Sequence, residues 1–239
     1  PNFACPLRLK HRLRKWISVL DVKEFWPVLI DKLFEAGKVR YVADLYRVTP
    51  EEIASLEGMG MGIAEKALGN LKTVSDLRLP RFVAGFDIGG IGELIVEKLV
   101  SAGYDTLDKL REAPVEELAE VEGIGTITAE TLKQGLQELR EHMEAVLQVG
   151  EVRIVAPAVD SPVAGKSFCF TGSLNTMKRS EAEEWVRSLG GQAKSSVTKE
   201  LDYLVTNDPE SGSSKNRKAR ELGVEIVTEE ELLELLRLA

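Results

Sequence analysis

The sequence predicts a multidomain chain: an all-α domain of tandem helical hairpins, then a small α/β domain with a mainly parallel sheet. Three observations predict it. Within residues 21–150, a helix–turn–helix pattern recurs after 65 or 66 positions, as expected for tandem structural units. Prolines interrupt the helical pattern at 151–162, which marks a linker. From 163 to 239, short apolar runs alternate with amphipathic helices, which is typical of a sheet covered by helices.

The composition is that of an ordinary globular chain of 239 residues, with 44% hydrophobic residues, 29% charged residues and a net charge of −8. No apolar run reaches the ~20 residues that span a bilayer, and the first residues do not form a signal peptide. Because the chain starts at Pro1 without a methionine, we expect a fragment or a processed chain. Two cysteines are too few for a disulfide framework or a zinc site within the chain. We therefore expect a reducing, cytoplasmic location and no membrane contact.

The charge is distributed unevenly along the chain. Residues 1–75 carry a net charge of +3, residues 76–150 carry −8 and residues 151–239 carry −3. Five bases and no acid precede Asp21: Arg8, Lys10, Arg12, Arg14 and Lys15. Such a basic segment fits either contact with nucleic acid or a solvated helix face. Because the middle of the chain is acidic, DNA binding there has to rely largely on backbone groups.

Turns of the form glycine–apolar–glycine mark the hairpins. One unit starts at Thr49 and Pro50, a typical N-cap pair, and continues through the turn into a second stretch with helical apolar spacing. Three turns share the form: Gly58-Met59-Gly60, Gly90-Ile91-Gly92 and Gly123-Ile124-Gly125. The same spacing predicts a fourth turn at Glu24-Phe25-Trp26, in which both glycines are replaced.

Each residue of such a turn has a physical role. The glycines permit a positive φ and bring the backbone close to a molecule outside. The apolar residue packs between the two helices, and the second helix begins with unpaired N–H groups that can hold a phosphate. Three such turns in register resemble the helix-hairpin-helix motif of DNA repair and ligation proteins, which implies binding of the sugar-phosphate backbone without sequence preference. The structural alternative is that the glycines only allow a tight connection between helices.

We therefore predict a set of DNA-binding residues on the turns and on the basic segment. The set is Gly58, Met59, Gly60, Gly90, Ile91, Gly92, Gly123, Ile124, Gly125, Arg8, Lys10 and Arg12. In the turn without glycines, Pro27 has no N–H to offer a phosphate. Phe25 and Trp26 are therefore expected to pack in the core or in an interface.

The second domain is predicted as alternating strands and helices. The pattern predicts strands at 167–171, 192–196, 203–206 and 225–227, and helices at 179–189, 214–222 and 229–237. Gly165-Lys166-Ser167 does not belong to a P-loop, because Asp160 stands where the upstream glycine would be and the triplet precedes a strand. Cys169 lies in an apolar strand and is expected to be a core thiol.

This domain resembles a BRCT module. The resemblance rests on Val163 to Phe168, Phe170 to Leu174, Met177 to Arg179, Leu189 to Gly191, Tyr203 to Val205, and Ser214 to Gly223. The run from Thr171 to Arg179 is most similar to the BRCT module that ends bacterial NAD-dependent DNA ligases, and the four hairpins follow the order of that family. Pro1 to Pro6 is similar to the end of the ligase zinc finger, in which Cys5 is the fourth metal ligand.

The resemblance implies the C-terminal part of a ligase that acts in DNA replication and repair, with nicked double-stranded DNA as partner. It implies the remnant of a zinc finger and a basic arm at 1–20, a tandem helix-hairpin-helix domain at 21–150, a linker at 151–162 and a BRCT domain at 163–239. NAD, Mg and Zn are expected for the full-length ligase and no cofactor for this fragment. The Lys-x-Asp-Gly motif of the adenylated lysine does not occur in the sequence, so no catalytic residue is predicted. The alternative is a non-catalytic repair scaffold whose BRCT domain binds a protein.

Related BRCT modules hold a phosphate, and the resemblance implies such a site at Thr171, Gly172 and Lys215. A hydroxyl and an N–H at the end of the first strand, with a lysine at the start of a helix, suit that role. The alternative is that Thr171 and Gly172 form only a turn and that Lys215 is a solvated residue at a helix start.

Overall fold

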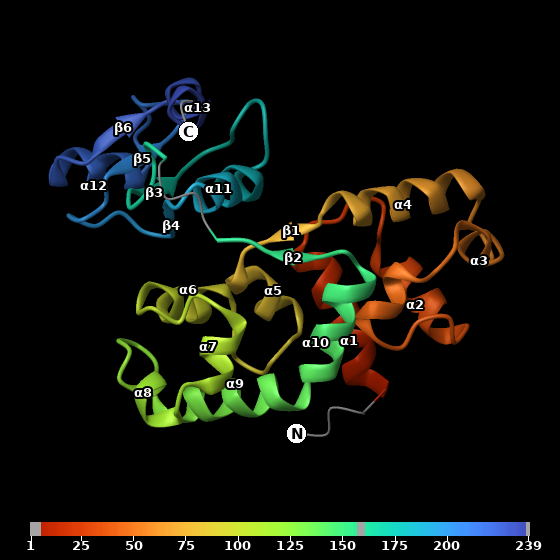
Figure 1. Ribbon diagram of the computed structural model, residues 1–239. Coiled ribbons are helices and arrows are strands. Elements are labelled where there is room, and N and C mark those ends of the chain that lie inside the picture. Colours follow the sequence, from red (N-terminus) through yellow and green to blue (C-terminus); the bar gives the residue numbers. More distant parts are fainter. Residues whose placement is uncertain (1–5, 157–160, 238–239) are drawn as a thin grey trace. The chain divides into compact units, whose positions relative to one another are not determined.

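The computed structural model describes residues 6–156 and 161–237 (Figure 1). The chain divides into two compact units, Pro1–Val155 and Ala156–Ala239. The division falls inside the segment predicted as a linker. The first unit is helical and the second has a parallel sheet with helices on both faces, so the predicted fold class is confirmed.

The helical unit consists of consecutive short helices and one short pair of strands. The helices are α1 (Pro6–Val19), α2 (Pro27–Glu35), the 3-10 helix η1 (Val42–Tyr46), α3 (Pro50–Ala54), α4 (Met61–Thr73), α5 (Leu79–Gly85), α6 (Glu93–Ser101), α7 (Leu107–Glu112), α8 (Val115–Ala119), α9 (Thr126–Glu138) and α10 (Arg140–Val149). The strands β1 (Asp76–Leu77) and β2 (Arg153–Ile154) pair in parallel. This pairing places the segment after α10 beside the segment between α4 and α5.

The predicted hairpins are pairs of contacting helices. Helices α3 and α4, α5 and α6, and α8 and α9 pack against each other across the three glycine turns, and α1 packs against α2 across the turn without glycines. Figure 1 shows α3 and α4, and α8 and α9, as such pairs. The predicted N-cap pair also starts a helix in the structure. The side chain of Thr49 accepts a hydrogen bond from the N–H of Glu52, and Pro50 is the first residue of α3.

Trp16 of α1 is a centre of the hydrophobic core of this unit. Its side chain is fully buried and lies edge-on to Phe82 and Phe86, with ring centroids 5.9 and 5.3 Å away. The indole N–H donates to the hydroxyl of Tyr46 at 3.0 Å, as a buried indole requires. Burial of that hydroxyl raises the pKa of Tyr46 to about 12. The first helix is therefore an integral part of the core.

The second unit is a parallel sheet in the order β4-β3-β5-β6. Its elements are β3 (Ser167–Phe170), α11 (Arg179–Ser188), β4 (Gln192–Lys194), β5 (Tyr203–Val205), α12 (Ser214–Leu222), β6 (Glu225–Val227) and α13 (Glu229–Arg237). Each follows its predicted range closely, and the largest difference is that β4 ends at Lys194.

The central strand β3 explains how the sheet is covered. Phe168 and Phe170 point to one face, where they pack with residues of α11 and α13. Cys169 points to the other face and packs with Ala219 of α12. Successive side chains of a strand point to opposite faces of the sheet, and helices cover both faces, so every residue of β3 is buried. The predicted core position of Cys169 is confirmed.

None of the described helices combines the length and the apolar character that a membrane span needs.

Candidate nucleic-acid interface

The three glycine turns have the same backbone conformation. The first glycine of each turn lies in the left-handed region, with φ of +75° at Gly58, +75° at Gly90 and +77° at Gly123. The second glycine is extended and is the N-cap of the following helix, with φ of −114°, −99° and −87° at Gly60, Gly92 and Gly125. The expectation that both glycines serve a positive φ is therefore wrong for the second one.

The middle residue of each turn fastens it to the core. Ile91 and Ile124 are 4% and 3% exposed, and Met59 packs on the same core. Their N–H groups donate to Ile88, Val121 and Leu56, at 2.9, 2.9 and 3.0 Å. The middle residues therefore lie inward, as predicted.

The second glycine of each turn leaves open space beside the start of a helix. A Cβ built on Gly60, Gly92 or Gly125 meets no described atom within 4 Å. Glycine has no side chain to cap the helix, and the first N–H groups of a helix have no partner within it. At each of the three turns, a phosphate can therefore approach the backbone closely.

The turn without glycines keeps the same path with other residues. Glu24 takes the left-handed conformation, with φ of +62°, and Phe25 is 2% exposed. Trp26 is the N-cap of α2 and Pro27 its first helical residue. The prediction of a core residue is confirmed for Phe25, but Trp26 is 47% exposed. Trp26 stands at the position of the second glycine. In the other turns, a Cβ built on that glycine meets no described atom within 4 Å.

The exposure of Trp26 predicts unequal effects for the two aromatic residues. Replacing Phe25 by alanine is expected to cost about 3 kcal/mol of stability, whereas Trp26→Ala should cost about 1 kcal/mol or less. DNA affinity of the folded Trp26→Ala protein should change little, because Pro27 offers no N–H. Urea unfolding followed by circular dichroism tests the first statement. Equal losses for both variants would contradict the assigned positions.

Each hairpin also exposes an apolar side chain at the start of its second helix. The four residues are Val28, Met61, Leu94 and Ile127, with exposures of 58%, 42%, 63% and 80%. They stand one or two positions after the N-cap. These residues were not predicted as site residues. An apolar residue recurs in the sequence after every turn, but amphipathic spacing alone does not distinguish an exposed apolar residue from a core residue.

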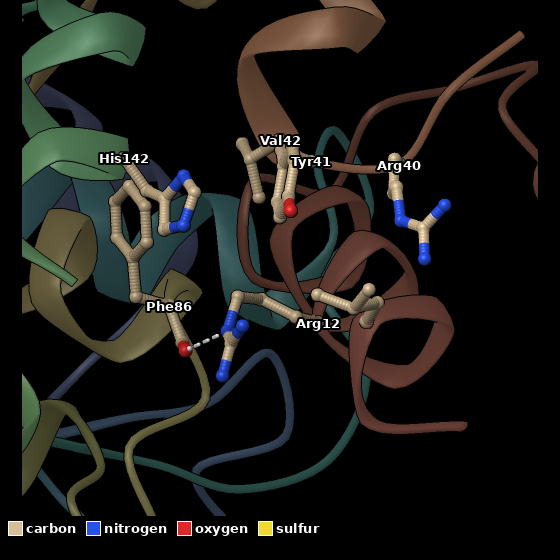
Figure 2. A pocket seen from close by; sticks show the side chains of 7 residues that line it. Arg12, Arg40, Tyr41, Val42, Phe86 and His142 are labelled. Carbon is tan, nitrogen blue, oxygen red and sulfur yellow. Dashed lines mark hydrogen bonds between the residues drawn. The ribbon is translucent and has the colours of Figure 1, made fainter. Parts of the chain in front are cut away.

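The predicted role of the basic segment needs correction at Arg12. Figure 2 shows its guanidinium pointing inward, where Nε donates to the carbonyl oxygen of Phe86 at 2.8 Å. Its side chain is 5% exposed and lies near the stacked rings of Tyr41 and His142, whose centroids are 4.4 Å apart. Burial lowers the pKa of His142, and the charge of Arg12 lowers it further. Arg12 thus joins α1 to the end of α5 and is not placed to contact DNA.

Arg8 and Lys10, the other two predicted bases, lie toward the surface. Arg8 is exposed. Lys10 forms ion pairs with Asp31 at 3.3 Å and Glu35 at 3.0 Å. Since α2 supplies both acids, it offsets the positive charge of α1 on that side.

The structure brings the three residues of the predicted BRCT phosphate site together. The N–H of Thr171 donates to Val205 at 3.0 Å, and Gly172 has φ of +74°. Lys215 Nζ donates to the carbonyl oxygen of Phe170 at 3.0 Å, directly before Thr171. Arg179 was not predicted here, yet it donates to the carbonyl oxygen of Gly172 at 3.0 Å. Two cations thus flank this turn.

Cys5, predicted from the resemblance as a zinc ligand, lies outside the described residues. Within the part of the chain that the structure describes, no group of three or more histidine, cysteine or acidic side chains is placed to hold a metal ion.

Comparison with known proteins identifies two domains in the chain and a group of proteins that are similar to it. Residues 159–236 match the BRCA1 C Terminus (BRCT) domain, and residues 86–138 match the SAM-like helix-hairpin-helix tandem. Three similar proteins are DNA ligases of Treponema denticola, Treponema pallidum and Sorangium cellulosum, which are 47%, 39% and 40% identical. The alignments cover 99%, 99% and 98% of this chain but 37%, 29% and 34% of those ligases.

The chain thus spans about a third of the length of the curated relatives that it matches. The matches to a helix-hairpin-helix tandem and to a BRCT domain agree with the similarity to DNA ligases along nearly the whole chain. The chain is similar along nearly its whole length to one part of these DNA ligases, and the predicted resemblance is confirmed.

Proposed function

We propose that the helical unit binds nicked double-stranded DNA through its sugar-phosphate backbone, as part of an NAD-dependent ligase of replication and repair. The observation that carries the proposal is the repeated turn, in which the second glycine leaves open space beside a helix start at Gly60, Gly92 and Gly125. Backbone N–H groups at a helix start bind phosphate oxygens irrespective of the neighbouring base. Binding of this kind carries no sequence preference.

The exposed apolar residues support the same proposal. Leu94 and Ile127 stand two positions after the second glycine of their turns and project to solvent. A deoxyribose ring is the apolar part of the DNA backbone next to each phosphate, and contact with it removes these side chains from water. A turn that holds a phosphate thus places an apolar side chain beside the adjoining sugar.

The segment contributes binding and no catalysis in this proposal. The Lys-x-Asp-Gly motif does not occur in the sequence, so the lysine that takes up AMP has to come from elsewhere in the ligase. NAD, Mg and Zn belong to the proposal only as cofactors of the full-length enzyme.

A binding titration against salt tests the proposal. Fluorescence anisotropy with labelled nicked duplexes of several sequences should give similar Kd values, and affinity should fall linearly on a double-logarithmic plot between about 50 and 200 mM salt. Nicked DNA should bind more tightly than an intact duplex of the same sequence. A chain that binds no duplex at low salt, yet binds a protein through residues 163–239, would favour the scaffold alternative.

The BRCT turn predicts a smaller, separate effect. Replacing Lys215 by alanine removes a cation beside Thr171 and Gly172, so the affinity for a 5′-phosphorylated DNA end should fall about threefold, the size of one exposed charge contact. Affinity for the same end without phosphate should not change. Lys218→Ala, an exposed lysine on the same helix, serves as control. Equal affinities of wild type and Lys215→Ala for the phosphorylated end would rule out the site.

A further inference from the structure

Two lysines reach from one hairpin to the turn of the next. Lys32 lies on α2, the second helix of the first hairpin, and its Nζ donates to the carbonyl oxygen of Glu57. Glu57 directly precedes Gly58, the first residue of the next turn. The charged end of Lys32 is therefore held at a glycine turn that is distant in the sequence.

The second case repeats the first in the other half of the unit. Lys98 lies on α6, the second helix of the third hairpin, and its Nζ occupies the space that a Cβ on Gly123 would need. Both lysines are the sixth residue of their helix. Lys66 is the sixth residue of α4 and is exposed. The position along the helix is therefore not sufficient to bring a lysine to a turn. The packing of one hairpin against the next places Lys32 and Lys98 there.

The two turns that receive a lysine have an acid directly before the first glycine. Glu57 precedes Gly58 and Glu122 precedes Gly123, both exposed, whereas Gly89 precedes the turn at Gly90. In that turn the acid, Glu93, follows the second glycine and forms an ion pair with Arg78 at 3.5 Å. A carboxylate beside a turn opposes the approach of a phosphate, and an ammonium at the same place offsets it. The distribution of lysines matches this electrostatic need.

We propose that Lys32 and Lys98 complete two composite phosphate sites, each made of the turn of one hairpin and the lysine of the preceding hairpin. The ligand is an internucleotide phosphate of duplex DNA. An ammonium has three donors, so Lys32 can keep its bond to Glu57 and still donate to a phosphate oxygen. Because the carbonyl holds it in place, little side-chain entropy is lost on binding. The inference rests on the proposed binding of DNA by the hairpins.

The salt dependence of binding separates a phosphate contact from a structural brace. Each lysine that neutralises a phosphate contributes about 0.9 to the slope of log Kobs against log salt. Lys32→Met and Lys98→Met, in the 239-residue chain, should each weaken binding of a nicked duplex about three- to tenfold and lower the slope by about one unit. The double variant should lower it by about two units. Lys98→Arg should keep the slope of the wild type.

Lys72→Met is the matched control, because Lys72 is an exposed lysine in the last turn of α4, about 16 Å along the helix from the turn. Its slope should equal that of the wild type. Folded Lys→Met variants with wild-type slopes would overturn the inference, and a loss of thermal stability without a change in slope would make the lysines structural braces. If the methionine variants do not fold, the Lys98→Arg variant provides the test. A lowered slope for the folded Lys98→Arg protein would also overturn the inference. A wild type that shows no salt-dependent binding would overturn the proposed function itself.

Discussion

Replacing Gly92 or Gly125 by valine is expected to weaken binding of nicked duplex DNA by more than tenfold, about 1.4 kcal/mol or above, in a protein that remains folded. Both glycines have φ values near −90°, which valine adopts without strain. A Cβ on either meets no described atom within 4 Å. The branched side chain would instead fill the space in which a phosphate has to approach the helix start.

The matched control is Gly69→Val. Gly69 lies inside α4, is exposed, and also has open space for a Cβ within the described structure, so the same substitution should leave DNA affinity unchanged. The first glycine of a turn is unsuitable for this test, because valine at Gly90 would strain the backbone at a φ of +75°. Anisotropy titration, with circular dichroism as the check of folding, measures both. Folded Gly92→Val and Gly125→Val proteins with wild-type Kd would remove the turns from the DNA interface.

Replacing Glu229 by glutamine is expected to cost the second unit about 3 kcal/mol at neutral pH. Glu229 is 3% exposed. It accepts hydrogen bonds from the N–H and hydroxyl of Thr176, at 2.9 and 2.6 Å, and from the amide of Asn207 at 2.8 Å. Burial alone would raise the pKa of Glu229, but these donors lower it from 4.5 to about 2. Glutamine presents its own N–H₂ to donors and leaves some of them unpaired.

The lowered pKa also predicts how stability depends on pH. In the unfolded chain Glu229 takes up a proton near pH 4.5, whereas the folded protein resists it down to about pH 2. Its contribution is therefore complete above pH 4.5 and is lost as the pH falls toward 2, by up to 1.4 kcal/mol per unit, an order-of-magnitude slope. Glu229→Gln should lack this part of the pH dependence.

Hydrogen exchange of the β3 amides measures this effect, because it reports the opening of the second unit separately from the first. Wild type and variant are compared at each pH, so intrinsic exchange rates cancel. Glu230→Gln, at the next and exposed position of α13, should match the wild type. A protection difference that stays constant from pH 6 to 3 would contradict the assigned pKa.

Local signals predicted the elements well because they depend on few neighbours. Thr49 with Pro50 predicted a helix start, and the apolar run around Cys169 predicted a buried strand. The middle residues Ile91 and Ile124 were placed in the core by their position in the turn alone. In each case the information lies within a few residues of the chain.

The errors arise where tertiary packing decides. Arg12 belongs to a run of bases, but helical periodicity turns it toward the carbonyl oxygen of Phe86, 74 residues later. Trp26 was expected in the core or in an interface, and its exposure of 47% excludes the core, because it replaces a glycine that has open space for a side chain in the other turns. Lys32 and Lys98 are not among the predicted site residues, since only the pairing of hairpins brings them to the turns. A repeat in the sequence shows that units are alike and does not show which surfaces of them meet.

The strand pair β1–β2 has a mechanical consequence. The N–H of Arg153 donates to Ser75 at 2.8 Å, that of Val155 donates to Leu77 at 2.9 Å, and the Arg153 side chain forms an ion pair with Asp76 at 2.7 Å. These contacts fasten the last residues of the helical unit. Tension applied to the chain beyond Val155 therefore acts on the hydrogen bonds of this strand pair and on the ion pair before it reaches α10. This clasp would be the first part of the unit to yield under a pulling force, and the helical hairpins would be shielded until it opens.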